Sequence, residues 1–403
     1  MKIIVVFILF FLFLLYIFLI FTHFCLFFTY FFLLRFSGFN DEWKSFKLNE
    51  VGNIVTGATP PTKDNDNFIN SGYLWVTPGD ISSKKFVSKT ERNLSEKGLK
   101  NGRKLDPNSI LVTCIGATIG KLCMINEIGS CNQQLNAISA NKNFYPDFIY
   151  YVIQKTAKNL ILIAGNTATP ILNKKSFGNL SYIFPSFNEQ KKIALFLDKI
   201  DKKRELLEKK YEFYQDFKKY LMQQIFTQKL RFDFNIIKLN DICDINKGKQ
   251  LNKENMVNFG EYYVLNGGKE PSGYTNSWNT PANTITISEG GNSCGYVNFN
   301  EEKFWSGGHC YYLSNLSSKI DLYYLYSYLK FIEPSIMRLR VGSGLPNIQK
   351  GDIENIKVKT LPINEQIKIR NVLRIIDKKI STLKVQKEHF EVFKKGLLQQ
   401  MFV

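Results

Sequence analysis

The sequence has few of the residues that build metal sites or disulfide frameworks. It contains only 3 histidines, and its 7 cysteines form no C-x-x-C pair. Tetrahedral zinc coordination needs Cys and His ligands in clusters, so we expect no metal site. An odd number of scattered cysteines also argues against a secreted, disulfide-rich fold, and we expect reduced thiols in the cytosol.

Acidic residues are scarce relative to basic ones. The chain has 53 Lys and Arg against 35 Asp and Glu, which gives a net charge of +18. This excess favours phosphate-rich or anionic-lipid partners. The length of 403 residues, with 44% hydrophobic and 22% charged side chains, excludes a disordered chain and predicts two or three packed domains.

Motifs of catalysis are also missing. The run from Gly116 to Lys121 has three residues between its glycines where a Walker A loop has four, and Leu122 replaces the Ser or Thr that binds magnesium. We interpret this run as a tight connection between strands. The Asn-Pro-Pro-aromatic motif with which amino-methyltransferases hold a flipped adenine is absent, and nuclease-like acidic residues at Asp147 and Glu301 lie in different halves of the chain. Metal-dependent hydrolysis needs converging carboxylates, so we predict a chain without catalytic activity.

Residues 1–33 form a strongly apolar segment. No Asp, Glu, Lys or Arg occurs from Ile3 to Leu34, and about 20 apolar residues suffice to cross a bilayer. The segment lacks the small residues with which transmembrane helices pack, and the rest of the chain has the composition of a soluble protein. Two interpretations stay open, a membrane anchor or an artefact of a misplaced translation start. We expect membrane association only if the segment is genuine.

A long repeat organises the chain. Residues 187–226 and 363–402 align without a gap, and about half of their positions are identical. Asn188 and Asn364 are the predicted N-caps of two helices. A helix of this length extends about 60 Å and must bury its apolar stripe, so we predict that the two copies pair as an antiparallel coiled coil. The predicted pairing residues are Ile193, Leu197, Ile200, Leu207, Phe217, Leu221, Ile369, Leu373, Ile376, Leu383, Phe393 and Leu397.

A second pair of matching segments opens each half of the chain. Both begin with Leu-Arg-Phe, at Leu34 and at Leu230, and both continue to a Lys-Leu-Asn-acidic run. Between these landmarks, short β-rich runs separated by Gly, Asn, Pro and Ser predict an α+β fold with a substantial sheet, and helices are expected at 146–164 and 321–339. After the apolar segment, the predicted organisation is a first domain at 34–185, a first long helix at 186–228, a second domain at 229–361 and a second long helix at 362–403.

These motifs, in this order, resemble the specificity subunit of a type I restriction-modification system. Each long helix begins with a proline followed closely by Glu-Gln-x-x-Ile, and the first half opens with the run LRFSGFNDEW from Leu34 to Trp43. The resemblance covers the chain from about residue 34 to its end, whereas the apolar segment before it departs from the family pattern. It implies two target-recognition domains alternating with two long helices.

The same resemblance implies a function. Each domain would read one half of a bipartite site in double-stranded DNA, and the helices would dock two methyltransferase subunits. Restriction and translocase subunits would complete a complex with type I site-specific deoxyribonuclease and adenine methyltransferase activity in the bacterial cytoplasm. This chain would itself bind no cofactor, because other subunits would use S-adenosylmethionine, ATP and Mg²⁺.

Candidate DNA-contacting residues are of two kinds. Lysines and arginines can release counterions from phosphates, and side-chain amides can bond adenine N6 and N7. Each candidate can also be interpreted as part of an ordinary solvated face or a polar turn. They are Lys84, Lys85, Lys100, Arg103, Lys104, Asn132, Gln133 and Gln134 in the first domain, and Asn266, Lys269, Asn276, Asn292, Ser293 and His309 in the second.

Two other functions remain as alternatives. One is a self-contained restriction or modification enzyme, against which the missing motifs argue. The other is a membrane-anchored interaction protein that uses its coiled coil, and it depends wholly on residues 1–33. The sequence does not specify the bases that would be read, because direct readout depends on loop geometry and DNA shape.

Overall fold

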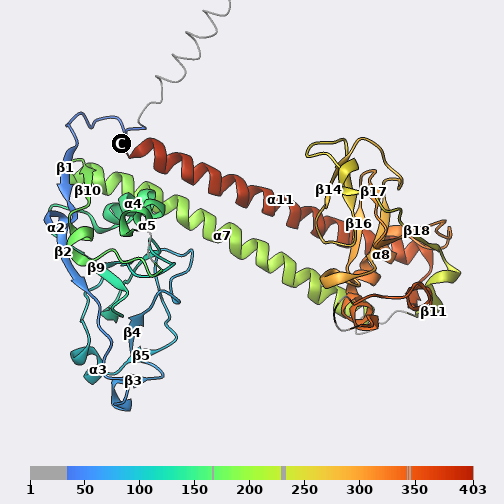
Figure 1. Ribbon diagram of the computed structural model, residues 1–403, viewed down its shortest axis with the longest axis horizontal. Coiled ribbons are helices and arrows are strands. Elements are labelled where there is room, and N and C mark those ends of the chain that lie inside the picture. Colours follow the sequence, from blue (N-terminus) through green and yellow to red (C-terminus); the bar gives the residue numbers. More distant parts are fainter. Residues whose placement is uncertain (1–33, 166–167, 228–232, 343, 345, 403) are drawn as a thin grey trace, which may run out of the picture. The chain divides into compact units, whose positions relative to one another are not determined.

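The computed structural model describes residues 34–165, 168–227, 233–342, 344 and 346–402. The chain divides into two compact units, of which the second is Glu208–Gln386 and the first contains the residues on either side of it. Each unit holds one sheet domain and one segment of both long helices, α7 (Phe187–Phe226) and α11 (Ile363–Met401), drawn green and red in Figure 1. The α+β fold with two domains alternating with long helices is confirmed.

The apolar segment 1–33 lies outside the described residues. Within the part of the chain that the structure does describe, no helix is both long enough and apolar enough to cross a membrane.

The first unit is built around two small sheets. The larger is antiparallel, with the order β2-β9-β6-β7, and the smaller has the order β3-β5-β4-β8 with β4 and β8 parallel. A separate pair, β1 and β10, is antiparallel. The strands are β1 (Lys44–Lys47), β2 (Gly52–Thr56), β3 (Phe68–Ile69), β4 (Tyr73–Val76), β5 (Asn93–Leu94), β6 (Ile110–Thr113), β7 (Leu122–Met124), β8 (Gly129–Cys131), β9 (Leu135–Ala140) and β10 (Ser181–Phe184), and the short helices are α2 (Leu48–Val51), α3 (Glu96–Asn101), α4 (Pro146–Thr156), α5 (Leu160–Ala164) and α6 (Lys174–Gly178).

The second unit repeats this plan. Its larger sheet has the order β12-β18-β15-β16, its smaller sheet the order β14-β13-β17 with β13 and β17 parallel, and β11 pairs with β19. The strands are β11 (Asn235–Lys238), β12 (Asp244–Lys247), β13 (Tyr262–Leu265), β14 (Gly273–Thr275), β15 (Thr284–Ser288), β16 (Val297–Asn300), β17 (Trp305–Ser306), β18 (Cys310–Ser314) and β19 (Lys357–Thr360), and the short helices are α8 (Leu322–Phe331), α9 (Glu333–Ile336) and α10 (Lys350–Glu354).

Each domain shares its hydrophobic core with the helix segments of its own unit. In the first unit, Leu197 of α7 and Leu397 of α11 belong to the same buried cluster as Phe148 of α4. In the second unit, Phe226 at the end of α7 packs on Tyr324 of α8, with ring centroids 5.8 Å apart, and Leu373 of α11 lies in that cluster. The helix ends are therefore part of the domains as well as connections between them.

The long helices pair in antiparallel fashion in each unit. In the first unit, Asp201 of α7 pairs with Lys394 of α11 at 2.6 Å, and Arg204, one turn later, pairs with the earlier Glu391 at 3.2 Å. In the second unit, Lys218 pairs with Asp377 at 2.6 Å. Most of the predicted pairing residues are buried, namely Ile193, Leu197, Leu207, Ile369, Leu373, Ile376, Leu383 and Leu397, while Ile200 and Leu221 are half-buried.

The predicted stripe is wrong at Phe217 and Phe393. These two side chains are 40% and 50% exposed. The next residue in each helix, Lys218 or Lys394, turns into the seam instead and meets an aspartate of the other helix. The sequence pattern selected the phenylalanines because they are apolar, but an ion pair occupies that seam position in both units.

The predicted N-caps also need correction. Helix α7 begins at Phe187 and α11 at Ile363, so Asn188 and Asn364 lie in the first turn of each helix. In the first backbone hydrogen bond of α7, the Gln190 N–H donates to the Ser186 carbonyl at 3.0 Å. Asparagine is a common cap, but the proline-containing turn before each helix starts it earlier. The helices predicted at 146–164 and 321–339 are present, each broken into shorter pieces.

Candidate nucleic-acid interface

One edge of the first domain gathers the polar ends of several strands, and we call the loops after β2, after β6 and before β9 edge 1. At the end of β2, Thr56 donates to the Asn136 side chain at 2.8 Å. After β6, the Cys114 backbone N–H donates to the Gln134 carbonyl at 2.8 Å. Burial raises the pKa of the Cys114 thiol to about 12, so this residue is a neutral, packed part of the edge.

The predicted amide run lies on edge 1. Asn132 is buried and bonds the Gln134 side chain at 3.0 Å, whereas Gln133 is exposed and accepts from the Thr59 hydroxyl. Gly57 makes this close packing of loops feasible, because a Cβ there would lie 2.1 Å from the Asn132 carbonyl oxygen. Of the three predicted amides, Gln133 is therefore the one most open to a ligand, and Asn132 chiefly holds the loop.

Three predicted basic residues of the first domain lie together. Lys100, Arg103 and Lys104 line a cleft of about 530 Å³ with Tyr73 at its side. All three are exposed, although Lys100 also pairs with Glu96 at 3.0 Å on the surface of α3. The Arg103 backbone N–H donates to the buried hydroxyl of Ser130, which ties this basic cleft to the strand leading into edge 1.

The remaining basic pair of the first domain does not join that cleft. Lys84 is exposed, but Lys85 is only 4% exposed and is bound by Asp147 of α4 and Asp198 of α7. The prediction of Lys85 as a phosphate contact is wrong, because a buried ammonium with two carboxylate partners has no free surface. Burial raises the pKa of Asp198, but the hydrogen bonds and charges of Lys85 and Lys202 together outweigh it, so this pKa lies below its usual value.

The corresponding loops of the second domain form edge 2, which follows β12 and β15 and precedes β18. Its centre is the carboxylate of Glu289, 5% exposed at the side chain. Lys247 at the end of β12 reaches Oε1 at 2.6 Å, and the Tyr311 hydroxyl donates to the same oxygen at 3.0 Å. His309 places Nδ1 3.5 Å from Oε2. Burial, with the Glu289 charge, raises the pKa of Tyr311.

Four further predicted residues belong to this side of the second domain. Asn266 accepts from the His309 backbone N–H at 3.2 Å through its side chain, and Lys269 lies over the ring of Tyr296, 5.5 Å from its centroid. Asn292 and Ser293 form a short turn directly after β15, with Asn292 exposed.

Asn276 is not part of edge 2. It follows β14, and β14 runs antiparallel to β13, so it lies at the end of this sheet opposite to Asn266. The sequence grouped the two because both are asparagines in Gly-rich loops, but the strand direction separates them. Sequence reasoning missed Glu289 and Lys247. In the sequence, Glu289 is marked only as a charged residue directly after a buried strand, and Lys247 only as a lysine at the end of another strand.

The two edges share a backbone frame. Thr56 faces Asn136 across β2 and β9, and Lys247 faces Tyr311 across β12 and β18, at the same position of the register. The Glu289 backbone N–H donates to the His309 carbonyl at 2.9 Å, as that of Cys114 does to Gln134. The two domains thus present different side chains on equivalent loops, as two modules with different specificities would.

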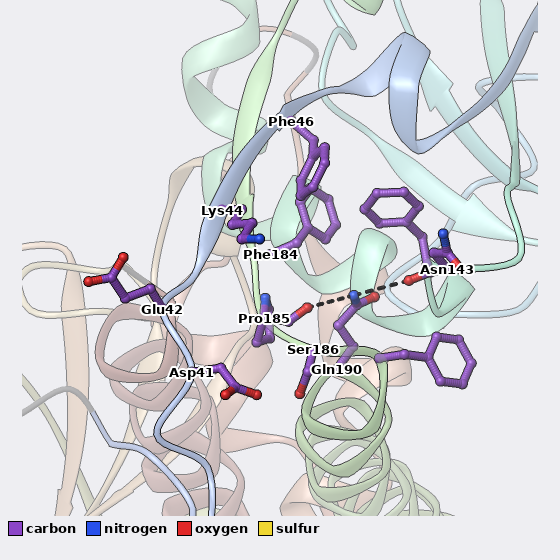
Figure 2. Close-up of a pocket in the computed structure, with 11 residues that line it drawn as sticks. Asp41, Glu42, Lys44, Phe46, Asn143, Phe184, Pro185, Ser186 and Gln190 are labelled. Carbon is purple, nitrogen blue, oxygen red and sulfur yellow. Dashed lines mark hydrogen bonds between the residues drawn. The ribbon is translucent and has the colours of Figure 1, made fainter.

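The repeated Glu-Gln motif has a structural role at the start of each long helix. Beside a cavity of about 660 Å³, the Gln190 amide donates to the carbonyls of Pro185 and Asn143 at 2.9 and 3.3 Å, as Figure 2 shows. In the second unit Gln366 makes the corresponding bonds to Leu361 and Lys319. The buried carboxylate of Glu189 accepts two hydrogen bonds from the Arg35 guanidinium, each at 2.8 Å. The motif anchors the start of each long helix.

A second apolar stripe of α7 faces solvent. Phe213, Phe217 and Tyr220 are spaced by four and three residues, so they share one helix face. They are 61%, 40% and 58% exposed, and the rings of Phe213 and Phe217 stack with centroids 6.1 Å apart. Large exposed apolar side chains in one row are typical of a protein contact surface.

A duplicated sheet domain on paired long helices, with a polar edge in each copy, is the architecture of a binding protein with two modules. The chain belongs to the family described as the type I restriction modification DNA specificity domain, which matches residues 40–225 and 232–390. A putative type I specificity subunit of Mycoplasma genitalium is 34% identical over 163 residues, which is 39% of this chain and 42% of that protein. The similarity to that relative thus spans less than half of its length.

Longer similarities are weaker in sequence. The type I restriction enzyme MjaVIII specificity subunit of Methanocaldococcus jannaschii is 21% identical over 402 residues, covering 89% of this chain and 91% of that protein. The crystal structure of the type I restriction-modification system S subunit from M. genitalium has the same fold, with a TM-score of 0.70 at 19% identity over 91% of this chain and 97% of that one.

Proposed function

We propose that this chain is the DNA-specificity subunit of a type I restriction-modification complex and that each of its two domains reads one half of a bipartite site. The observation that carries the proposal is the pair of edges, which place different polar side chains on one backbone frame. Family membership and the net charge of +18 support DNA as the ligand. Loops on a rigid sheet are where recognition residues generally lie.

In this proposal the basic cleft supplies affinity and the two edges supply specificity. The basic cleft with Lys100, Arg103 and Lys104 contacts phosphates, which fix position without reading sequence. Gln133 and the other exposed polar side chains of edge 1 and edge 2 contact the hydrogen-bonding groups of the bases. We expect the contributions of the two domains to the binding free energy to add, as those of independent modules do.

The test is a domain replacement read by single-molecule methylation sequencing. Cells carry this chain with a type I methyltransferase subunit, and residues 45–180 are replaced by the corresponding domain of a relative. The methylated motif is expected to be interrupted, and the replacement should change one half of it and leave the other half intact. A control replacement of the second domain should change only the other half. Absence of any interrupted motif in wild-type cells, or a change of both halves together, would overturn the proposal.

The long helices dock two methyltransferase subunits in this proposal. The exposed row of Phe213, Phe217 and Tyr220 supports it, since α7 offers there a second apolar face in addition to its seam. Restriction and translocase subunits join the same complex in the cytoplasm. S-adenosylmethionine, ATP and Mg²⁺ are bound by the methyltransferase, restriction and translocase subunits and not by this chain. Phe213→Glu should abolish co-purification with the methyltransferase subunit at unchanged melting temperature. Gln215→Glu, which adds the same charge to another exposed face of α7, is the matched control and should co-purify normally.

The competing function, a self-contained restriction or modification enzyme, has a direct test. The purified chain alone is incubated with DNA, S-adenosylmethionine, ATP and Mg²⁺. Methylation or cleavage without any partner would favour that alternative, whereas DNA binding without turnover is expected here.

A further inference from the structure

The second domain holds a buried charge where the first domain holds none. Glu289 occupies the backbone position of Cys114: its carbonyl accepts from the Ile348 N–H at 2.9 Å, as that of Cys114 accepts from Leu172 at 2.8 Å. Both side chains are buried, at 4% and 2% exposure. Since the same fold closes around a neutral thiol in one domain, it does not require a carboxylate in the other.

A buried carboxylate is unfavourable unless it is fully paired, so its presence needs a reason. Here Oε1 of Glu289 accepts from the Lys247 ammonium and the Tyr311 hydroxyl, and Nδ1 of His309 lies 3.5 Å from Oε2. Tyr311 is buried, but the side chains of Lys247 and His309 are 53% and 64% exposed. The carboxylate therefore holds two nitrogen-bearing side chains in fixed positions while both still face solvent on edge 2.

We propose that Lys247 and His309 are the specificity-determining residues of the second domain, that Glu289 positions them, and that Lys247 reads a guanine. This inference rests on the proposed function and deepens it. The Lys247 ammonium carries only donors, and two of its three remain available beyond Glu289. Guanine is the base that presents two acceptors, N7 and O6, in the major groove, and lysine is one of its regular partners. His309 turns Nδ1 to the same carboxylate, and its side chain is 64% exposed.

The position of these residues supports base reading over phosphate contact. Edge 2 corresponds to edge 1, where the equivalent of His309 is Gln134 and the neighbouring Gln133 is exposed. The amides of edge 1 suit adenine, and the Lys247 ammonium of edge 2 suits guanine. The two domains thus differ in chemistry at the same structural position, as two readers of different bases must.

The experiment measures base preference with the whole chain in complex with its methyltransferase subunit. Lys247→Gln and His309→Ala are compared with wild type by methylation sequencing and by binding to DNA libraries randomised in each half-site. We expect each variant to lose about tenfold or more of the discrimination at one G·C pair of the second half-site, with the first half-site unchanged. Lys303→Gln removes an exposed lysine of the same domain that lies over Trp278, 4.4 Å from its ring centroid, and should leave every position unchanged.

Glu289→Cys tests the positioning role, since it installs the side chain that the first domain carries. The variant should melt close to wild type yet lose discrimination at the same G·C pair as Lys247→Gln. A merely structural role would instead lower the melting temperature and weaken all sequences alike.

Two outcomes would overturn the inference. If Lys247→Gln weakens binding equally for all sequences and lowers the salt slope by about one, Lys247 contacts a phosphate. If base preference is unchanged in both Lys247→Gln and His309→Ala, edge 2 does not read sequence there. Failure of the proposed function is a separate result, because wild-type complex would then show no bipartite motif at all.

Discussion

The buried ion pair in the helix seam of the first unit should contribute more to the free energy of unfolding than the corresponding ion pair in the second unit. Asp201 and Lys394 are 4% and 7% exposed, and Asp201 also accepts from the Tyr151 hydroxyl at 2.9 Å. Burial lowers the pKa of Lys394, and the charge of Asp201 opposes that shift. We predict that Lys394→Met, which keeps the length of the side chain and removes its charge, leaves Asp201 largely uncompensated.

The magnitude follows from burial. Removing one partner of a buried pair costs about 3 to 5 kcal/mol, and the low end applies here because Arg204 remains 3.7 Å from Asp201. A loss of about 3 kcal/mol lowers the melting temperature of a unit of this size by roughly 6 to 12 °C. In the second unit, the Lys218 and Asp377 side chains are 17% and 27% exposed, and Lys218→Met should cost only about 1 kcal/mol.

The assay is a double-mutant cycle followed by thermal unfolding with a probe in each unit, because two units need not melt together. Asp201→Asn keeps an acceptor for Tyr151 while removing the charge. Combined with Lys394→Met it should recover a large part of the single-variant loss, since no unpaired charge then stays buried. The reasoning is refuted if Lys394→Met is no more damaging than Lys218→Met, or if the two losses at Asp201 and Lys394 simply add.

Two further predictions concern the same helices. Leu197→Asp and Leu373→Asp, which bury an unpaired charge in the two cores, should each destabilise their own unit by several kcal/mol, while Lys203→Asp on an exposed position should change unfolding little; equal melting of all three would contradict the pairing. Because the pKa of Asp198 in the folded chain lies below its usual value, its pairing stabilises the fold fully above the pKa of an unfolded aspartate, about 3.9, and the stabilisation is lost as the pH falls through the lower pKa of the folded state. Asp198→Asn should therefore flatten the fall in melting temperature below about pH 4, as measured by calorimetry.

The architecture was predictable because its signals are local or repeated. A 40-residue amphipathic segment that occurs twice predicts two paired helices, and alternating apolar runs between them predict the sheets. Phe226 and Phe402, which end the two copies and are buried in the domain cores, carried the same repeat signal but were not singled out. Their burial depends on where the last helical turn meets the sheet domain, and the repeat alone does not state that.

The seam and the edges were less accessible to sequence reasoning, since both depend on residues far apart in the chain. Nothing near Lys394 indicates that Asp201 lies opposite, so a hydrophobicity pattern places Phe393 in the seam instead. In the sequence, Lys85 belongs to a basic run. In the fold, α4 and α7 place Asp147 and Asp198 next to it, and it pairs with both. In the same way, the sequence does not show that Glu289 contacts Lys247 and His309. The pairing of β12 with β18 places these two residues beside it.

Under the proposed function, the length of the long helices sets the gap between the two half-sites. An insertion in α7 alone would be the simplest way to change that gap, but α7 is paired with α11 in both units, through Asp201 with Lys394 and through Lys218 with Asp377. Each domain core also contains segments of both helices. An insertion confined to α7 would therefore put one of the two ion pairs, and one of the two cores, out of register, at the cost of a buried charge or a cavity. A change in helix length that keeps both domains folded has to lengthen α7 and α11 together by the same number of residues.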